Sequence, residues 1–264
     1  MSMFNYISVI LLSLFTTIIF VFLILYSDRK SSEPIYMILF CLLSSVFTIS
    51  LSLFLGQYLL PKLDIISYGL FNYKTQNMVK ILVLALVEEY SKLLVLYLFV
   101  SKNKHFDDIY DGFVYSSLIA LSFAAYESLI YVFNEPDFTS MKSLAVLRGI
   151  TTVPLHLMCG ISMGYFMGKE KFSWGIKTRI INLLLCLLFP TFLHFIYNLT
   201  LTNIINRYMD SNLLSIMVLI FFLPFYIISY IFIEKTKFLN DKFIKNINYK
   251  NLMTKKEYAK LTKK

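Results

Sequence analysis

ILVLALVEEYSKLLVLYLFV, which occupies residues 81–100, decides the fold class of this chain. A run of about 20 predominantly apolar residues is long enough to cross a bilayer as one helix. Three charged side chains, Glu88, Glu89 and Lys92, nevertheless stand in the middle of the run. Placing one such charge near the centre of a bilayer costs roughly 2.5 to 3.5 kcal/mol, so three together indicate a polar site inside the membrane.

The composition outside this stretch indicates that the bilayer is the solvent of the whole chain. Residues of the AVILMFWYC set make up 58% of the 264 residues, and charged residues only 16%. The apolar residues come in runs of about 20 rather than in amphipathic stripes, which is typical of membrane spans. Cys41, Cys159 and Cys186 lie within such runs, so we interpret them as small apolar residues rather than as disulfides or a metal cluster. The sequence predicts an all-α integral membrane protein.

The net charge of +9 is concentrated at one end of the chain. Residues 234–264 hold ten Lys against Glu234, Asp241 and Glu257, a net charge of +7, and the remainder is nearly balanced. A Lys-rich segment directly after an apolar run is better explained by a cytoplasmic position near anionic lipid headgroups than by nucleic acid. We therefore expect the lipid bilayer, and no nucleic acid, as a partner.

The apolar runs predict a bundle of about seven transmembrane helices around a buried polar site. The spans are expected at residues 6–26, 35–55, 78–100, 109–133, 144–168, 180–203 and 212–233. All should be helices, because an open backbone cannot satisfy its hydrogen bonds in lipid. Residues 56–77 fit an interfacial helix or lid on the outer surface, and equally a simple connector. The simplest division is one multi-span membrane domain at 1–235, with its polar core segments at 78–200, and a Lys-rich cytoplasmic tail at 236–264.

Basic residues between the spans predict the orientation of the bundle. They gather in alternate connections: Arg29 and Lys30, then Lys102 and Lys104, then Lys169, Lys171, Lys177 and Arg179, then the Lys-rich tail. The opposite connections carry fewer basic groups. Because cytoplasmic loops are enriched in Lys and Arg, we expect the N-terminus outside and the C-terminus in the cytoplasm of a multi-pass cell-membrane protein.

Polar side chains that a lipid-facing helix avoids occur on four of these spans. They are Glu88, Glu89 and Lys92 on the third, Glu127 on the fourth, Arg148 and His156 on the fifth, and His194 and Asn198 on the sixth. At about 1.5 Å per residue, they lie roughly 6 to 18 Å below the outer boundary of the membrane. Helices that run in alternate directions do not align polar residues by chance. We infer one shared site that opens outward.

Spacing within the helices supports a shared site. Glu88 and Lys92 are four residues apart, as are His194 and Asn198, so each pair should project from one face into the cavity. Glu89 is turned by about 100° from Glu88. It can therefore pair with Lys92 and leave Glu88 free.

These groups suffice for peptide hydrolysis. Glu88 can act as the general base that activates water, with His156 or Glu127 sharing the water across the cavity. His194 and Asn198 can donate hydrogen bonds to the developing oxyanion. Alternatively, Glu88, Glu127, His156 and His194 can be metal ligands, a set that suits zinc with an open position for water. No H-E-x-x-H pairing occurs in the sequence, so the zinc version has the weaker support and no cofactor is required.

Four segments resemble the PrsW-type intramembrane proteases, within the wider group that includes the CAAX prenyl endopeptidases. VEEYSK at 87–92 is similar to the family's E-E-x-x-K, and DGFVYSSLIALSFAAYE at 111–127 to its D-G stretch ending in F-x-x-x-E. RGITTVPLH at 148–156 and HFIYN at 194–198, similar to H-x-x-x-N, complete the set. Ser122 and Ser128 depart from the expected Gly and Asn, which puts local packing in doubt more than chemistry.

The resemblance implies an endopeptidase that cuts a single-pass membrane-anchored protein, typically an anti-sigma factor, on its extracytoplasmic side to start a stress response. It also implies that Glu88 activates water, that Glu89 orients and pairs, and that His156, His194 and Asn198 complete the site. Arg148, like Lys92, is a supporting residue that either snorkels to the interface or serves the site. A mechanism by glutamate alone and one with a metal both stay open.

Other interpretations compete with the protease. A proton-coupled transporter also places Glu, Lys and His at mid-membrane, although the sequence shows neither repeated halves nor paired Gly-interrupted helices. A non-catalytic membrane scaffold is the main alternative, and the full set of polar groups argues against it. Asp107, Asp108 and Asp111 begin the fourth span, where helix capping explains them without catalysis. The sequence leaves the oligomeric state and the identity of the substrate open.

Overall fold

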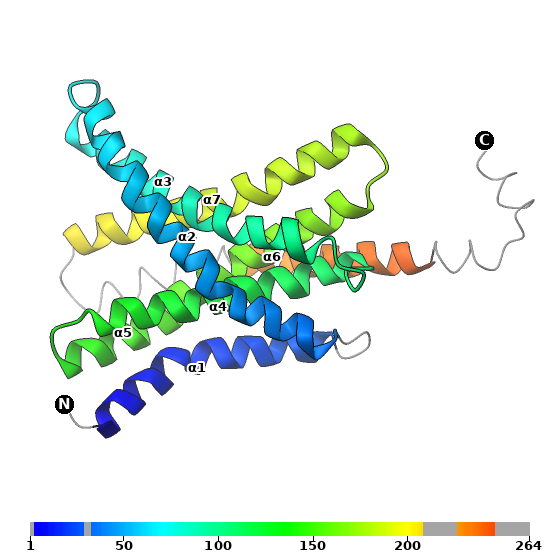
Figure 1. Ribbon diagram of the computed structural model, residues 1–264, viewed down its shortest axis with the longest axis horizontal. Helices are drawn as coiled ribbons and strands as arrows, with labels where there is room; N and C mark the ends of the chain where they lie inside the picture. The colour runs from blue at the N-terminus through cyan, green and yellow to red at the C-terminus, as the bar shows by residue number, and fades with distance from the viewer. Residues whose placement is uncertain (1–2, 29–32, 208–225, 246–264) are drawn as a thin grey trace, which may run out of the picture.

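The computed structural model describes residues 3–28, 33–207 and 226–245. Over these residues the chain is a bundle of helices without strands (Figure 1). The helices are α1 (Met3–Ser27), α2 (Ile35–Ser67), α3 (Tyr73–Val95) with the π-helical turn η1 (Leu96–Val100), α4 (Ile109–Phe133), α5 (Phe138–Ile150), α6 (Thr152–Phe172) and α7 (Ile176–Arg207). Residues 226–245 are also helical.

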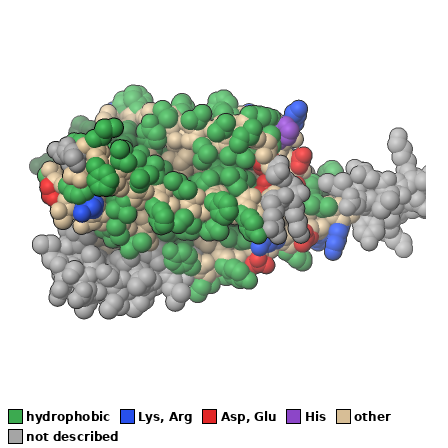
Figure 2. Space-filling model, turned by 90° about the horizontal axis from the view of Figure 1, so that it is seen from below, with side chains coloured by type: hydrophobic (Ala, Val, Ile, Leu, Met, Phe, Trp, Pro, Cys, Tyr) green, Lys and Arg blue, Asp and Glu red, His purple; other side chains and the backbone are tan. Residues whose placement is uncertain are grey.

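The surface of the bundle confirms an integral membrane protein. Within the described ranges, five segments are long and apolar enough to cross a membrane, namely α1, α2, α4, the pair α5 and α6, and α7 as far as Thr202. Helix α3 is not among them, because its C-terminal part carries the charged residues of the polar site. Figure 2 shows apolar side chains covering the middle of one face, with charged groups gathered at the two ends. A soluble protein would not expose so much apolar surface.

Most predicted spans coincide with single helices. Those at 6–26, 109–133 and 180–203 fall within α1, α4 and α7, and the one at 78–100 corresponds to α3 with η1. The turn between α3 and α4 and the turn between α6 and α7 lie at the same end of the bundle (Figure 1). Two of the connections predicted to be basic, those with Lys102 and Lys104 and with Lys169 to Arg179, therefore share one end, as the alternation of spans requires.

The span predicted at 144–168 lies within one apolar segment long enough to cross a membrane, Phe138–Phe172, and two helices meet inside it. Helix α5 ends at Ile150 and α6 begins at Thr152, while Thr151 between them has φ −121° and ψ −63°. Pro154 lies in the first turn of α6, where a missing N–H is tolerated. A continuous helix would place the proline ring against the carbonyl group of Ile150. Because of this break, Arg148 on α5 and His156 on α6 extend from two helices with different axes.

The separate interfacial helix or lid predicted at 56–77 does not form. Helix α2 continues through this segment to Ser67, a turn with Gly69 at φ +78° follows, and α3 begins at Tyr73. Asn72 caps α3 by accepting a hydrogen bond from the Thr75 amide at 2.9 Å. The polar residues of this stretch therefore belong to the adjoining ends of α2 and α3 and to the turn between them.

The last predicted span and the tail are described only in part. Residues 212–225 of that span and 246–264 of the tail lie outside the described residues. The expected domain boundary at 235 falls inside one continuous helix, 226–245, which packs on the bundle. Thr236 is fully buried, and the rings of Phe243 and Phe172 lie 4.7 Å apart. The side-chain oxygen of Asn240 accepts a hydrogen bond from the Ile109 amide at the start of α4.

Small residues bring α4 and α6 into close contact. A Cβ atom on Gly164 would lie 2.2 Å from the carbonyl oxygen of Gly112, and one on Gly160 would lie 2.7 Å from the Cβ of Ala120. Ser116, between these positions on α4, donates a hydrogen bond to the Gly160 carbonyl at 2.7 Å. Such spacing of small residues is the usual basis of tight helix pairs in membranes. It fixes α4 relative to α6 and therefore the polar groups that each helix carries.

The acidic residues at the start of α4 are structural, as predicted. Asp108 is the N-cap and accepts hydrogen bonds from the amides of Tyr110 and Asp111, at 2.7 and 3.0 Å. Asp111 in turn accepts one from the Asp108 amide at 2.8 Å, which completes a capping box. Ser122, where the family pattern has glycine, is buried and donates to the carbonyl of Cys41 on α2 at 3.3 Å.

Candidate active site

A cavity of about 570 Å³ lies between the helices that carry the predicted site residues. Its walls come from α2, α3, α4, α7 and the junction of α5 and α6. Five of the predicted residues line it: Glu88, Glu127, Arg148, His194 and Asn198. The other three, Glu89, Lys92 and His156, are buried behind this wall, with exposed fractions of 0%, 1% and 0%. The site therefore has a layer that faces the cavity and a layer behind it.

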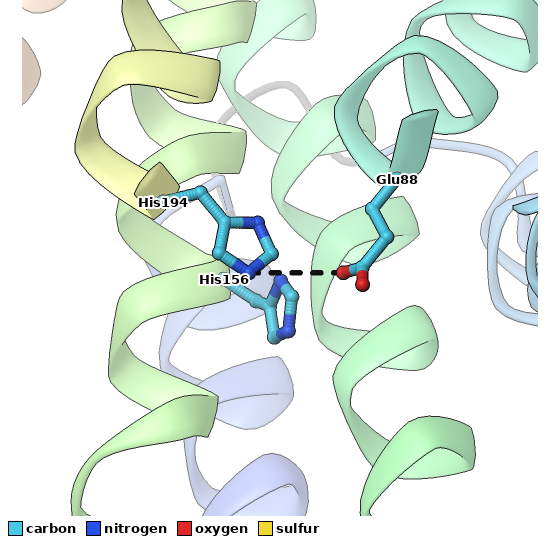
Figure 3. Close-up of side chains that lie close together, drawn as sticks. All are labelled: Glu88, His156 and His194. Carbon is cyan, nitrogen blue, oxygen red and sulfur yellow. Dashed lines mark ion pairs between the residues drawn. The ribbon is translucent and has the colours of Figure 1, made fainter. Parts of the chain in front are cut away.

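Glu88 and His194 form the centre of the cavity-facing layer. They extend from α3 and α7 toward one another, with His156 of α6 beside them (Figure 3). Glu88 Oε2 lies 3.7 Å from His194 Nε2, too far for a hydrogen bond. This oxygen is buried and has no hydrogen-bond partner among the described residues. A buried carboxylate oxygen without a partner is costly, so the geometry provides a place for a water molecule or a cation.

Lys92 joins the buried layer together. Its ammonium group lies 2.7 Å from Glu89 Oε1 and 2.9 Å from His156 Nδ1, and 4.3 Å from the centre of the Phe123 ring. Glu89 Oε1 also lies 2.8 Å from His194 Nδ1. The pairing of Glu89 with Lys92, which leaves Glu88 free, agrees with the sequence prediction. The side chain of Lys92 does not share the cavity with Glu88, because Glu89 and His156 hold it in the protein interior.

Glu127 is held between two cationic or proton-donating partners. Glu127 Oε2 lies 2.6 Å from Arg148 Nη2 and 3.0 Å from His156 Nε2. Ser128 accepts a second hydrogen bond from Arg148 at 3.1 Å, so the serine found in place of asparagine has a partner of its own. Arg148 also lies over the ring of Tyr131, 4.4 Å from its centre. Arg148 therefore positions Glu127 and does not snorkel away from the site.

These contacts fix the protons on both imidazole rings. A lysine ammonium can only donate, so His156 Nδ1 accepts from Lys92 and His156 Nε2–H donates to Glu127. A carboxylate can only accept, so His194 donates from Nδ1 to Glu89. His194 Nε2 is thereby directed at Glu88 and the cavity. A histidine oriented in this way by a carboxylate is typical of metal ligands.

The donor set fits a divalent metal ion at one corner of the site. Ligand atoms of Glu88, His156 and His194 lie within 4.8 Å of one another. Glu88 Oε2 without a partner and His194 Nε2 are available directly. Both nitrogens of His156 are engaged, Nδ1 by Lys92 and Nε2 by Glu127, so His156 can bind a metal only by giving up one of these contacts. Glu127, the fourth ligand considered from the sequence, is occupied by Arg148 and His156.

The sequence reasoning missed the groups that hold α7 against the junction of α5 and α6. Tyr197 Oη lies 2.8 Å from Thr152 Oγ1 and donates to Thr151 Oγ1 at 3.1 Å. Thr151 donates in turn to the carbonyl of Leu147. Tyr197 is one turn beyond His194, so this contact fixes the height of His194 beside His156. The only signal for Tyr197 in the sequence was its position inside HFIYN. Because tyrosine is common where membrane helices reach the interface, this position did not indicate a special role.

Comparison with known proteins agrees with this geometry. A family model described as "PrsW family intramembrane metalloprotease" matches residues 33–229. Protease PrsW of Clostridioides difficile (strain 630) is 32% identical over 192 residues, which cover 72% of this chain and 78% of the relative. Protease PrsW of Oceanobacillus iheyensis is 33% identical over 180 residues, covering 67% and 75%, and that of Bacillus subtilis (strain 168) is 31% identical over 179 residues, covering 68% and 76%.

No solved structure matches the chain. The family match spans α2 to α7, and therefore every helix that contributes to the cavity. It also favours a protease over the scaffold and the transporter. The chain belongs to the PrsW family of intramembrane proteases.

Proposed function

We propose that this protease cleaves a single-pass membrane protein, an anti-sigma factor, near its extracytoplasmic face and so starts a stress response by regulated proteolysis. The observation that carries the proposal is Glu88, a carboxylate with an unpartnered oxygen at the wall of a cavity inside the membrane. The substrate class comes from the resemblance of the sequence motifs. The depth of Glu88, about 15 Å from the outer boundary at 1.5 Å per residue, supports cleavage in the outer half of the membrane.

Glu88 is the general base in the proposed reaction. It takes a proton from a water molecule in the cavity while the water oxygen bonds to the carbonyl carbon of the scissile peptide bond. As the carbon–nitrogen bond breaks, the same proton passes from Glu88 to the leaving nitrogen. Asn198, which also lines the cavity, donates to the oxyanion, and so does His194 when its Nε2 carries a proton. Glu89 holds the ring of His194 in place from behind.

The remaining polar groups of the site hold one another in position. Arg148 orients Glu127, Glu127 orients His156, and Lys92 balances the charge of Glu89. Without histidine charges, the site contains three carboxylates against Lys92 and Arg148. The site therefore carries one negative charge in excess, at Glu88. An excess negative charge in a low-dielectric cavity favours the binding of a cation.

Zinc is the cation that this donor set suits best, and Glu88, His156 and His194 would hold it. A metal ion bound there supplies Lewis-acid polarisation of the water and of the peptide carbonyl. With the ion bound, Glu89 would still hold the ring of His194 and Glu127 that of His156, whereas Glu88 and His194 would be ligands instead of general base and oxyanion donor. The glutamate reaction does not require the ion, so its presence has to be measured.

We expect purified protein to contain about one zinc ion per chain, measured by inductively coupled plasma mass spectrometry after gel filtration. His194→Ala should remove most of the metal, because it deletes the best oriented donor. Asp108→Asn should retain it, because asparagine is also a good N-cap and position 108 is remote from the cavity. Cleavage of the substrate by wild-type protein that contains no metal would exclude the metal-dependent mechanism and support the reaction by glutamate alone.

The charges of the loops indicate how the bundle is oriented in the membrane. We propose that the end with the α3–α4 and α6–α7 turns faces the cytoplasm and that the N-terminus lies outside. We also propose that residues 1–235 carry the activity and that 236–264 serve as the cytoplasmic extension. In this orientation the cavity opens toward the outer leaflet, where a substrate with an outside domain has its span.

The function is tested by co-expressing the chain with an epitope-tagged, single-pass anti-sigma factor that has an outside domain. Wild-type protein should convert the substrate to a shorter membrane-bound fragment on an immunoblot. Glu88→Gln and His194→Ala should abolish conversion at normal abundance, which means a loss of at least about a hundredfold for a general base. Asp108→Asn should cleave like the wild type. Equal loss in Asp108→Asn would show that the active centre is elsewhere.

A further inference from the structure

One wall of the cavity has no part in the chemistry described above. It is formed by α2, whose residues reach the cavity from Ile49 to Pro61 at intervals of three and four positions, so one face of the helix is turned inward. The buried positions of α2 become sparse beyond Gly56. The outer part of this helix therefore contacts the cavity more than it contacts the rest of the protein.

Gln57 is the amide that this wall presents to the cavity. Its side chain is exposed and makes no hydrogen bond with any described residue. Ser52, on the same wall, already donates a hydrogen bond to the Ile49 carbonyl. Thr152, on α6, is paired with Tyr197 of α7. Asn198 on α7 is a second amide that lines the cavity, also with no described partner for its side chain.

A transmembrane substrate segment needs hydrogen-bond partners for its backbone when it enters such a cavity. In a transmembrane helix the backbone groups bond to one another, and hydrolysis of a peptide bond requires that a stretch be unwound. The released N–H and C=O groups must find partners, because no bulk water is available within the bilayer. An amide side chain offers both an acceptor and donors, so it matches a peptide group on either side.

We propose that Gln57 binds the main chain of the unwound substrate segment on the outer side of the scissile bond, with Asn198 on another wall of the same cavity. This subsite rests on the proposed function. It adds that the protease recognises the extended main chain of its substrate, largely independently of the substrate's side chains. The apolar residues around Gln57, among them Leu53, Leu60 and Leu201, contact the flanking substrate side chains. Gln57 lies about 33 Å along α2 from its first residue, which in the proposed orientation places it toward the outer end of the cavity.

The test compares Gln57→Leu, Gln57→Asn and the control Ser50→Leu in purified, reconstituted protein. Ser50 is an exposed polar residue of the same helix that does not line the cavity. With a tagged single-pass substrate, Gln57→Leu should raise KM about five- to tenfold with little change in kcat, since one binding hydrogen bond is lost. Gln57→Asn should show a smaller increase, and Ser50→Leu should match the wild type. An unchanged KM in Gln57→Leu, or an equal rise in Ser50→Leu, overturns the proposal.

A second measurement does not depend on turnover. A photoreactive benzoylphenylalanine at position 57, in the Glu88→Gln background, should cross-link the substrate within its membrane span, whereas the same group at position 50 should not. Absence of the cross-link at 57, with one present from position 201 of the same cavity, overturns the subsite while the protease function stands. Cleavage by wild type that persists in Glu88→Gln overturns the proposed function instead, and the cross-link then reports substrate contact alone.

Discussion

Glu88 and Glu89 are neighbours in the sequence with opposite surroundings. One turn of about 100° places the Glu88 carboxylate at the cavity and the Glu89 carboxylate against Lys92 and His194. Glu89 is fully buried, and its Oε1 receives both of these contacts. The two acids are therefore expected to contribute differently, Glu88 to the reaction and Glu89 to the placement of the groups around it.

We expect Glu89→Gln to lower the free energy of unfolding by about 3 kcal/mol, because it leaves the buried Lys92 charge without its counterion. Glu88→Gln should leave stability unchanged or slightly higher, since it removes an unpartnered buried charge. Thermal unfolding of both variants in the same detergent provides the measurement, and each variant is the control for the other. Equal melting temperatures would contradict the different surroundings of the two acids.

At the level of the elements, the α4–α6 contact determines where Glu127 and His156 meet. Gly164 permits that contact, because a Cβ atom there would lie 2.2 Å from the carbonyl oxygen of Gly112. Gly164→Ala should therefore separate the helices and destabilise the protein by about 2 kcal/mol, with a parallel fall in cleavage. The measurement is the melting temperature together with substrate conversion.

Gly175→Ala is the matched control for this helix contact. A Cβ atom there would meet only the hydroxyl of Thr178, at 3.6 Å, so neither stability nor cleavage should change. A melting temperature of Gly164→Ala equal to that of Gly175→Ala would show that the close approach of α4 and α6 is not needed.

At the scale of the whole molecule, the helix at residues 226–245 docks on the rest of the bundle. Asn240 bonds to the Ile109 amide at 3.0 Å and to the Asp108 carboxylate at 3.1 Å, and Phe243 packs on Phe172. We expect deletion of 246–264 to preserve melting temperature and cleavage. Deletion of 240–264 should remove about 1 to 2 kcal/mol of stability, because the start of α4 loses a capping partner. Identical behaviour of the two truncations would contradict the docking of this helix.

The sequence could predict the features that depend on composition and spacing. Runs of about 20 apolar residues predicted the membrane bundle, and charged residues inside them predicted the polar residues that now meet at the cavity. Periodicity along one helix also predicted the pair of Glu89 with Lys92. These inferences need only the geometry of a single helix and the cost of charge in lipid.

Features that depend on contacts between helices could not be predicted in the same way. That Lys92 bonds to His156 rather than facing the cavity depends on α6, 64 residues along the chain. The break at Thr151 was hidden because Pro154 is compatible both with a kinked helix and with the start of a new one. The helix through residue 235 crosses an expected domain boundary because charge marks the membrane surface and not the end of a helix.

The central claim is that one carboxylate at an intramembrane cavity performs peptide hydrolysis. Purified protein in liposomes, mixed with a tagged single-pass anti-sigma factor and followed by mass spectrometry of the fragments, tests it most directly. We predict one cut inside the outer half of the substrate's membrane span, absent with Glu88→Gln and present with Asp108→Asn. A cut confined to the substrate's soluble domain, or cleavage by Glu88→Gln at the wild-type rate, would contradict the claim.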